Sequence, residues 1–324
     1  MKTIKDVAKL AGLGIATVSR YVNGKDYVSA DAKKKIELAM KQLDFQPNAV
    51  ARSIKIKKTN TVALVLPNIS NPFFLELAEA VETNLMENGY KVILCNTHED
   101  ERRERDYIDM ILQNRVDGVV SATGTYNMAQ RFKKNGVPVV WLDRFSGSKC
   151  NKVVSVTTDN YQGTVEAVEF LIKKGCQKLL HLGSNLGTMP AVVRYEAFRN
   201  VCAAAGIDYS FLVYKMLSPA EIDLIFEQGY DGVFAWNDSV AIKFMSQCLM
   251  RRLKIPEEIQ IIGFDDIIFA RDIYPALTTV RQPIAQLGQA TCQILIKMMT
   301  EGEGEELADI VLNNQLVIRK TTKE

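Results

Sequence analysis

Polar side chains at helical spacing near the N-terminus could bind a polyphosphate. Thr17, Ser19, Arg20 and Asn23 would share one face of a short helix whose other face is apolar. Hydroxyl and amide groups donate hydrogen bonds to phosphate oxygens, which positions a protein on DNA without reading its sequence. A guanidinium can donate two hydrogen bonds to one guanine and so read a base. This face therefore predicts contacts to double-stranded DNA.

A second set of polar residues follows apolar runs later in the sequence. Asp143 ends the run VPVVWLD, Asn237 follows DGVFAW, and Asp265 ends IQIIGFD. Carboxylates and amides bond the hydroxyl groups of a sugar, and aromatic rings such as Phe73 and Phe74 stack on its C–H face. These residues predict a small-molecule site. No GxGxxG or Walker-type phosphate loop occurs in the sequence.

The distribution of charge supports DNA binding by the N-terminal part alone. Residues 1–60 hold 13 Lys and Arg against 5 Asp and Glu, a net charge of +8. The whole chain carries +2, so the remaining 264 residues carry −6. A basic segment joined to an acidic body is the arrangement expected when only the segment contacts a polyanion.

The DNA-contacting face would belong to the second helix of a helix-turn-helix. Residues 4–11 form one apolar stripe, and Gly12-Leu13-Gly14 interrupts the helix before a second stripe begins. The alternative is an ordinary pair of helices in a core, which the surrounding positive charge disfavours. A third helix is predicted from Ala30 to Leu43, with Ser29 as its N-cap.

The sequence divides into three parts. Gln46-Pro47-Asn48 ends the third helix, because the residue before a proline disfavours the α conformation. A short helix is predicted over Asn48–Ile54, and Lys55–Asn60 is typical of a basic linker. We therefore predict a head of residues 1–46, a hinge and linker of residues 47–60, and a core of residues 61–324.

Short apolar runs alternate with amphipathic segments throughout the predicted core. One set has strands at 62–67, 91–96, 117–122 and 137–143, with helices at 73–88, 100–114 and 128–135. A second set has strands at 153–159, 178–183, 231–236 and 259–265, with helices at 163–174, 191–205 and 239–252. Buried parallel strands alternating with helices predict doubly wound α/β structure, here in two lobes. Ligands of such folds bind beyond the carboxyl ends of the strands.

Composition gives no sign of a membrane, metal or catalytic site. The chain is 47% hydrophobic and 24% charged, no apolar run could span a bilayer, and the N-terminus has no signal-like region. We therefore expect a cytoplasmic protein. The six cysteines never occur at CxxC spacing, and His98 and His181 have no partner arrangement. We predict no metal, no cofactor and no catalytic residue.

The chain resembles the lactose-repressor/galactose-repressor (LacI/GalR) family of bacterial transcription regulators over essentially its whole length. The motifs that carry the resemblance are, in order, TIKDVAKLAG, TVSRYVNG, PNAVARSIK, PNISNPFF, IGFDD and PALTTVRQP. The family implies a helix-turn-helix, a hinge helix, and a two-lobed core like the type I periplasmic binding proteins. On this basis the N-terminal lobe takes residues 61–158 and 283–310, and the C-terminal lobe takes residues 159–282 and 311–324.

The resemblance assigns DNA-contacting roles residue by residue. Ile15, Ala16 and Arg20 occupy base-reading positions, and Ile54 stands where a leucine wedge usually opens the minor groove. Gly14 replaces a serine that is common in the family and so lacks its hydroxyl. The remaining members of the predicted DNA-binding set are Ile4, Lys5, Thr17, Ser19, Asn23, Tyr27, Ser29, Asn48, Ala51 and Lys55.

The core also resembles the ribose-type periplasmic binding proteins. That resemblance assigns effector contacts to Asn71, Phe73, Phe74, Asp143, Arg144, Arg194, Trp236, Asn237, Asp265 and Gln282. Purely structural roles stay open for some of these residues. Phe73 and Phe74 could be core residues, Asn71 could cap a helix before Pro72, and the two aspartates could also cap helices.

The sequence thus predicts a homodimeric repressor of a sugar-utilisation operon that binds operator DNA and responds to ribose or a similar sugar. Closure of the lobes around the effector would order or melt the hinge helices. Fructose- or sucrose-derived effectors, a sugar phosphate and a phosphocarrier corepressor stay open. The alternatives from other classes are an enzyme acting on sugars or nucleosides and a transport-type binding protein.

Overall fold

The chain forms two compact units in a computed structural model that describes residues 2–22, 28–45, 58–123, 126–143, 153–214, 219–301 and 307–324. The units are a head, Met1–Thr59, and a core, Asn60–Glu324. No helix among the described residues is long and apolar enough to cross a membrane.

The head contains the three predicted helices, α1 (Ile4–Ala11), α2 (Ile15–Val22) and α3 (Ala30–Gln42). Thr3 and Asp6 cap α1 reciprocally, and Gly12 ends it in the left-handed conformation at φ 64°. Ser29 caps α3 as predicted, by accepting a hydrogen bond from the Ala32 N–H. The apolar stripes of the helices meet in a small core of Val7, Ala8, Val18, Ile36 and Ala39.

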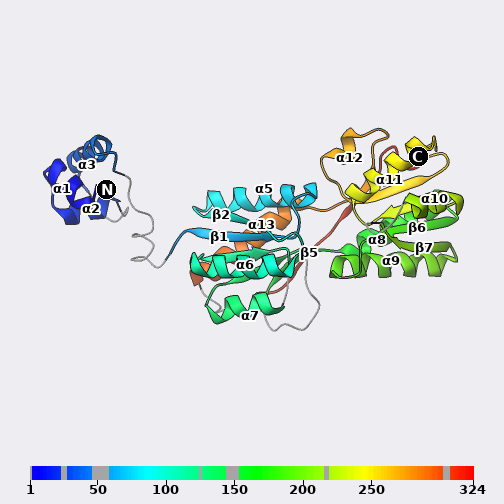
Figure 1. Ribbon diagram of the computed structural model, residues 1–324, viewed down its shortest axis with the longest axis horizontal. Coiled ribbons are helices and arrows are strands. Elements are labelled where there is room, and N and C mark those ends of the chain that lie inside the picture. Colours follow the sequence, from blue (N-terminus) through cyan, green and yellow to red (C-terminus); the bar gives the residue numbers. More distant parts are fainter. Residues whose placement is uncertain are drawn as a thin grey trace. The chain divides into compact units, whose positions relative to one another are not determined.

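The N-terminal lobe of the core is a six-stranded parallel sheet in the order β11-β5-β4-β3-β1-β2. Helices α5 and α13 cover one face and α6 and α7 the other (Figure 1). Its strands are β1 (Thr61–Leu66), β2 (Lys91–Asn96), β3 (Gly118–Ser121), β4 (Val139–Leu142), β5 (Ser155–Thr158) and β11 (Ile310–Leu312). Its helices are α5 (Pro72–Glu87), α6 (Glu101–Gln113), α7 (Tyr126–Lys134) and α13 (Ile284–Glu301).

The C-terminal lobe repeats this design in the order β12-β10-β9-β8-β6-β7, and only the β10–β12 pairing is antiparallel. Its strands are β6 (Lys178–Gly183), β7 (Asp208–Val213), β8 (Gly232–Ala235), β9 (Gln260–Asp265), β10 (Thr278–Arg281) and β12 (Gln315–Val317). Its helices are α8 (Asn160–Lys173), α9 (Met189–Ala205), α10 (Pro219–Glu227), α11 (Asp238–Met250) and α12 (Phe269–Asp272). The predicted two-lobed, doubly wound architecture is therefore confirmed.

Three segments carry the chain between the lobes: β5 to α8, β10 to α13, and β11 to β12. Hydrogen bonds join these crossovers to one another. The Thr158 hydroxyl donates to Gln282 Oε1 at 2.7 Å, and Asn314 Nδ2 donates to the Asp159 carbonyl at 3.0 Å. The crossovers therefore form one bonded bundle between the lobes.

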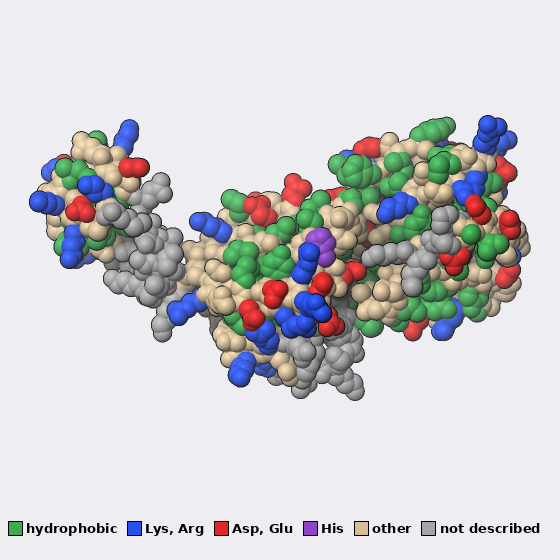
Figure 2. Space-filling view, viewed as in Figure 1, with side chains coloured by type: hydrophobic (Ala, Val, Ile, Leu, Met, Phe, Trp, Pro, Cys, Tyr) green, Lys and Arg blue, Asp and Glu red, His purple; other side chains and the backbone are tan. Residues whose placement is uncertain are grey.

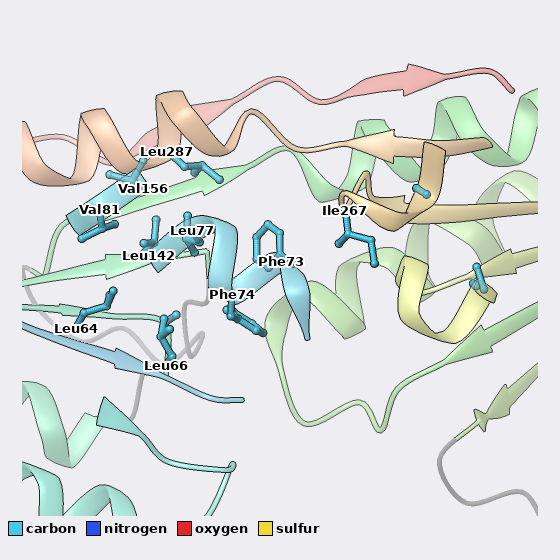
Figure 3. Close-up of a cluster of buried hydrophobic side chains, with 14 of the residues drawn as sticks. Leu64, Leu66, Phe73, Phe74, Leu77, Val81, Leu142, Val156, Ile267 and Leu287 are labelled. Carbon is cyan, nitrogen blue, oxygen red and sulfur yellow. The ribbon is translucent and has the colours of Figure 1, made fainter. Parts of the chain in front are cut away.

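Apolar packing continues from the N-terminal lobe to the edge of the C-terminal lobe. Leu64 and Leu66 on β1 pack with Leu77 on α5, and all three are fully buried. Phe73 and Phe74 occupy the end of α5 that is nearer the C-terminal lobe, and Ile267 extends from that lobe toward them (Figure 3). The two phenylalanines are therefore core residues, which is the structural role that the sequence left open for them.

His181 on β6 is a fully buried imidazole. Its ring stacks on those of Phe198 and Phe234, and its Nδ1 lies 3.0 Å from the Phe234 carbonyl oxygen. Burial lowers the pKa of His181 from 6.5 to about 4, and Arg194 contributes in the same direction.

We expect the His181 contribution to be complete above pH 6.5 and to be lost as pH falls toward 4, because the unfolded chain takes up the proton first. Between pH 7.5 and pH 5, the wild type should lose about 2 kcal/mol more unfolding free energy than His181→Leu. Denaturant titrations of both proteins at the two pH values measure this difference. Equal losses would remove His181 as the cause.

Candidate functional site

The head exposes the residues that the sequence assigns to base reading. Ile15 on α2 is 48% exposed, and Ala16 and Arg20 are exposed beside it. Thr17 and Ser19 are half-buried. Lysine and arginine side chains stand out over the surface of the head (Figure 2). An exposed helix of this kind can enter a major groove.

Three other predicted DNA-contacting residues of the head are described. Lys5 is exposed, Ile4 is half-buried against the core of the head, and Ser29 already serves as the α3 cap. The other predicted DNA-contacting residues lie outside the described residues, as does the predicted effector contact Arg144; they are Asn23, Tyr27, Asn48, Ala51, Ile54 and Lys55.

Nine of the ten predicted effector residues line one pocket in the core. Both lobes contribute to it. The lining consists of Asn71, Phe73, Phe74, Asp143, Pro190, Arg194, Trp236, Asn237, Asp265 and Gln282. Pro190 is the one lining residue that the sequence did not predict.

The N-terminal lobe contributes a capped helix start and a carboxylate. Asn71 caps α5 by accepting a hydrogen bond from the Phe73 N–H at 3.2 Å, and Pro72 occupies the first turn. Phe73 and Phe74 contact each other edge to face, with ring centroids 5.1 Å apart. Asp143 follows β4 with φ 63° and is 5% exposed. The capping role and the pocket position of Asn71 therefore coexist.

Arg194 is the central cation of the pocket and is held rigidly. It projects from α9 with 3% exposure, and its guanidinium carbon lies 3.5 Å from the centroid of the Phe264 ring. Its Nε donates to Asn160 Oδ1 at 2.8 Å, and its Nη1 donates to the Trp236 carbonyl. These bonds fix the plane of the guanidinium and leave Nη2 4.0 Å from Asp265 Oδ1.

Asp265 is a buried carboxylate at the end of β9. Gln282 Nε2 donates to its Oδ1 at 2.8 Å. Burial raises the pKa of Asp265 to about 7, although Arg194 and Gln282 oppose the shift. It does not cap the following helix, because the N-cap of α12 is Ile268. Asp265 is therefore available as an acceptor whose charge changes near neutral pH.

Two buried residues beside the pocket escaped the sequence prediction. Asn160 holds Arg194, and Thr158 holds Gln282. Both stand at or just after the end of β5, so the signal that marked Asp143 and Asp265, a polar residue following an apolar run, also applied to them.

The lining of the pocket has the chemistry that recognises a polyhydroxylated small molecule. It offers two carboxylates, side-chain amides, one guanidinium and aromatic rings, which is the donor and acceptor set that recognises hydroxyl groups. Among the described residues, no group of His, Cys, Asp and Glu side chains could hold a metal ion.

Family models match the head and the core separately, and known repressors match nearly the whole chain. Residues 3–48 match the model of the bacterial regulatory proteins of the lacI family, and residues 168–322 match the periplasmic binding protein-like domain. The ribose operon repressor of Halalkalibacterium halodurans is 38% identical over 100% of this chain and 98% of its own. The sucrose operon repressor of Streptococcus mutans is 35% identical over 91% of this chain and 92% of its own.

Solved structures give the same result. A periplasmic binding protein/LacI transcriptional regulator from Alkaliphilus metalliredigens, complexed with D-xylulofuranose, is 31% identical with a TM-score of 0.73, covering 82% of this chain and 100% of its own. The Lac repressor dimer bound to operator shares the fold with a TM-score of 0.84, at 23% identity over 99% of both chains. This chain therefore belongs to the lacI family of bacterial regulatory proteins.

Proposed function

We propose that this protein represses a sugar-utilisation operon and that a small neutral sugar, ribose or a close relative, controls it from the core pocket. The observation that carries the proposal is the convergence of nine predicted effector residues on one pocket. The relatives named above regulate ribose and sucrose operons, and a related regulator binds a pentulose. Family membership excludes the enzyme alternative, because lacI-family proteins regulate transcription.

The charge of the pocket favours a neutral ligand over a sugar phosphate. Asp143 and Asp265 supply two carboxylates, and Arg194 supplies one guanidinium that already holds Asn160 and the Trp236 carbonyl. A phosphate would bring further negative charge beside the carboxylates. A sugar hydroxyl can instead donate to Asp265 while the aromatic rings cover the C–H face of the sugar.

Regulation would follow from the two-lobed design. A sugar that binds both lobes favours one arrangement of the lobes, and only a difference in its affinity for the two arrangements can shift the population. We propose that residues 47–60 form the hinge between the head and the core. The functional unit would be a homodimer, so that two heads read the two halves of a symmetric operator.

A thermal-shift and operator-release series tests the effector class. We expect D-ribose to raise the melting temperature of the core, because a ligand at 100 times its Kd adds about 2.7 kcal/mol of stability. D-Fructose, sucrose and ribose 5-phosphate are the comparison ligands. Stabilisation by ribose 5-phosphate but by none of the neutral sugars would contradict the proposal.

The DNA arm uses duplexes that the wild-type protein selects from a random library. A core fragment of residues 60–324 should lose binding to the selected duplex and keep its thermal response to sugar, because the head forms a separate unit. Retained DNA binding by the fragment would contradict the assignment of the head.

A further inference from the structure

Asp238 is a buried carboxylate outside the pocket lining. It is the first residue of α11 and has no exposed surface. Each of its oxygens accepts one hydrogen bond. The Ile267 N–H donates to Oδ2 at 2.9 Å, and the Thr279 hydroxyl donates to Oδ1 at 2.5 Å. The carboxylate therefore joins α11, the turn after β9, and β10.

Each of these three segments also carries a pocket residue. Asn237 precedes Asp238 in the chain, Asp265 lies two residues before Ile267, and Gln282 lies three residues after Thr279. One side chain thus links the segments that carry three C-terminal-lobe contacts of the pocket.

The turn after β9 needs external support. Asp265 and Asp266 have φ values of 112° and 58°, in the left-handed region that non-glycine residues rarely adopt. Such a conformation persists when surrounding contacts hold it. Asp266 is held by Arg281 Nε at 2.7 Å and by Arg319 Nη2 at 2.6 Å. The other end of the turn is held through the Ile267 N–H by Asp238.

The sequence of β9 makes room for this carboxylate. A Cβ at Gly263 would lie 2.1 Å from Asp238 Oδ1 and 3.0 Å from a Leu277 methyl carbon. No side chain larger than hydrogen fits there without moving Asp238. The glycine in the motif IGFDD therefore serves the close approach of Asp238 to the strand.

We propose that Asp238 is a positioning residue that fixes the Asp265 turn and thereby presets the C-terminal-lobe half of the effector pocket. The proposal rests on the proposed function for the identity of the pocket. Its second support is Ile267, whose side chain belongs to the same buried cluster as Phe73 and Phe74 (Figure 3). Holding the Ile267 backbone therefore also fixes an apolar contact toward the N-terminal lobe.

The test compares variants that keep or remove the two hydrogen bonds. Asp238→Asn keeps both, because its carbonyl can accept from the Ile267 N–H and its amide can donate to the Thr279 hydroxyl. Asp238→Leu removes both. Thr279→Val removes one and is the milder variant should Asp238→Leu fail to fold. The matched control is Thr321→Val, which removes two buried hydrogen bonds, one with Ile261 near the start of β9 and one with Thr278 at the start of β10, and leaves both bonds of Asp238 in place.

Two readouts are used on the full-length protein. Hydrogen exchange of the peptide covering residues 264–270 reports on the turn without any ligand. We expect Asp238→Leu to exchange at least about 10-fold faster there and Asp238→Asn to match the wild type. Calorimetric titration with D-ribose, D-fructose and sucrose should give about 10- to 100-fold weaker binding for Asp238→Leu, an intermediate loss for Thr279→Val, and a change within about 3-fold for Asp238→Asn.

The control separates positioning from general stability. Thr321→Val should melt at a lower temperature yet keep wild-type exchange in residues 264–270 and wild-type sugar affinity. The proposal is overturned if Asp238→Leu and Thr279→Val retain wild-type exchange, or if Thr321→Val loses as much sugar affinity as they do. If the wild type binds none of the three sugars, the effector class is wrong, and the exchange readout alone decides the role of Asp238.

Discussion

Replacing Arg20 with alanine is expected to weaken binding to the selected operator by at least about 30-fold, because the proposed dimer would lose two bidentate base contacts of about 1–3 kcal/mol each. The guanidinium stands on the exposed face of α2, beside Ile15 and Ala16. Its removal should also relax the preference for one base pair in each half-site. Titration of operator and random duplexes measures both effects.

Lys34→Ala is the matched control for Arg20→Ala. Lys34 is an exposed cation on α3 of the same head, and its loss removes the same charge. We expect it to weaken operator and random DNA alike and only modestly, with a shallower salt dependence. Equal losses on operator and random DNA for Arg20→Ala would falsify its base-reading role.

Asp265→Asn is expected to weaken sugar binding by about 10-fold or more while leaving operator binding intact, because a charge-assisted acceptor is replaced by a neutral one. The free energy of unfolding of the variant should rise at neutral to alkaline pH, although its sugar affinity falls. The folded-state pKa of Asp265 is raised to about 7, so its stabilising contribution is complete below pH 3.8 and is lost as pH rises through 7. At pH 8 the variant should therefore be more stable than the sugar-free wild type, by on the order of 4 kcal/mol at most.

Calorimetry beside denaturant unfolding separates a contact role from a structural one. Asp231→Asn is the control, because Asp231 accepts backbone hydrogen bonds from Gln177 and Lys178 before β8, at the other end of the sheet. It should lose stability and keep sugar affinity.

The wild-type sugar affinity should rise between pH 6 and pH 8 with release of a proton, since the sugar favours the ionised carboxylate. An Asp265→Asn protein that binds sugar as the wild type does would remove Asp265 from the site.

The alternation of apolar runs predicted most of the fold because parallel strands buried on both faces read as continuous hydrophobic segments. β1 and β9 are of this kind, with nearly every residue buried. β7 was not predicted. It is an edge strand, half-buried and mixed in polarity, so it lacks the pattern of a central strand. β10 also escaped, because its buried threonines are satisfied by side chains that are distant in the sequence, among them Asp238 and Thr321.

Most of the pocket residues could be named from the sequence because they follow a strand or begin a helix, whereas Arg194, inside α9, was named only from the family resemblance. The hydrogen bonds that support these residues could not be predicted, even where a supporting residue such as Asn160 carried the same sequence signal. Asn160 and Asp238 contact Arg194 and the Asp265 turn only after the sheet has brought separate segments together. The supporting role of such a residue depends on contacts between segments distant in the sequence, and the spacing of residues in a single sequence does not reveal these contacts.

The crossovers also set the order in which the protein can be assembled during synthesis. The head uses residues from the first 45 alone, so it can fold soon after it leaves the ribosome. Neither lobe can finish so early. The N-terminal lobe needs α13 and β11, and the C-terminal lobe needs β12, which begins at Gln315. A chain that stops short of these elements would therefore keep a folded head while lacking a complete sugar sensor.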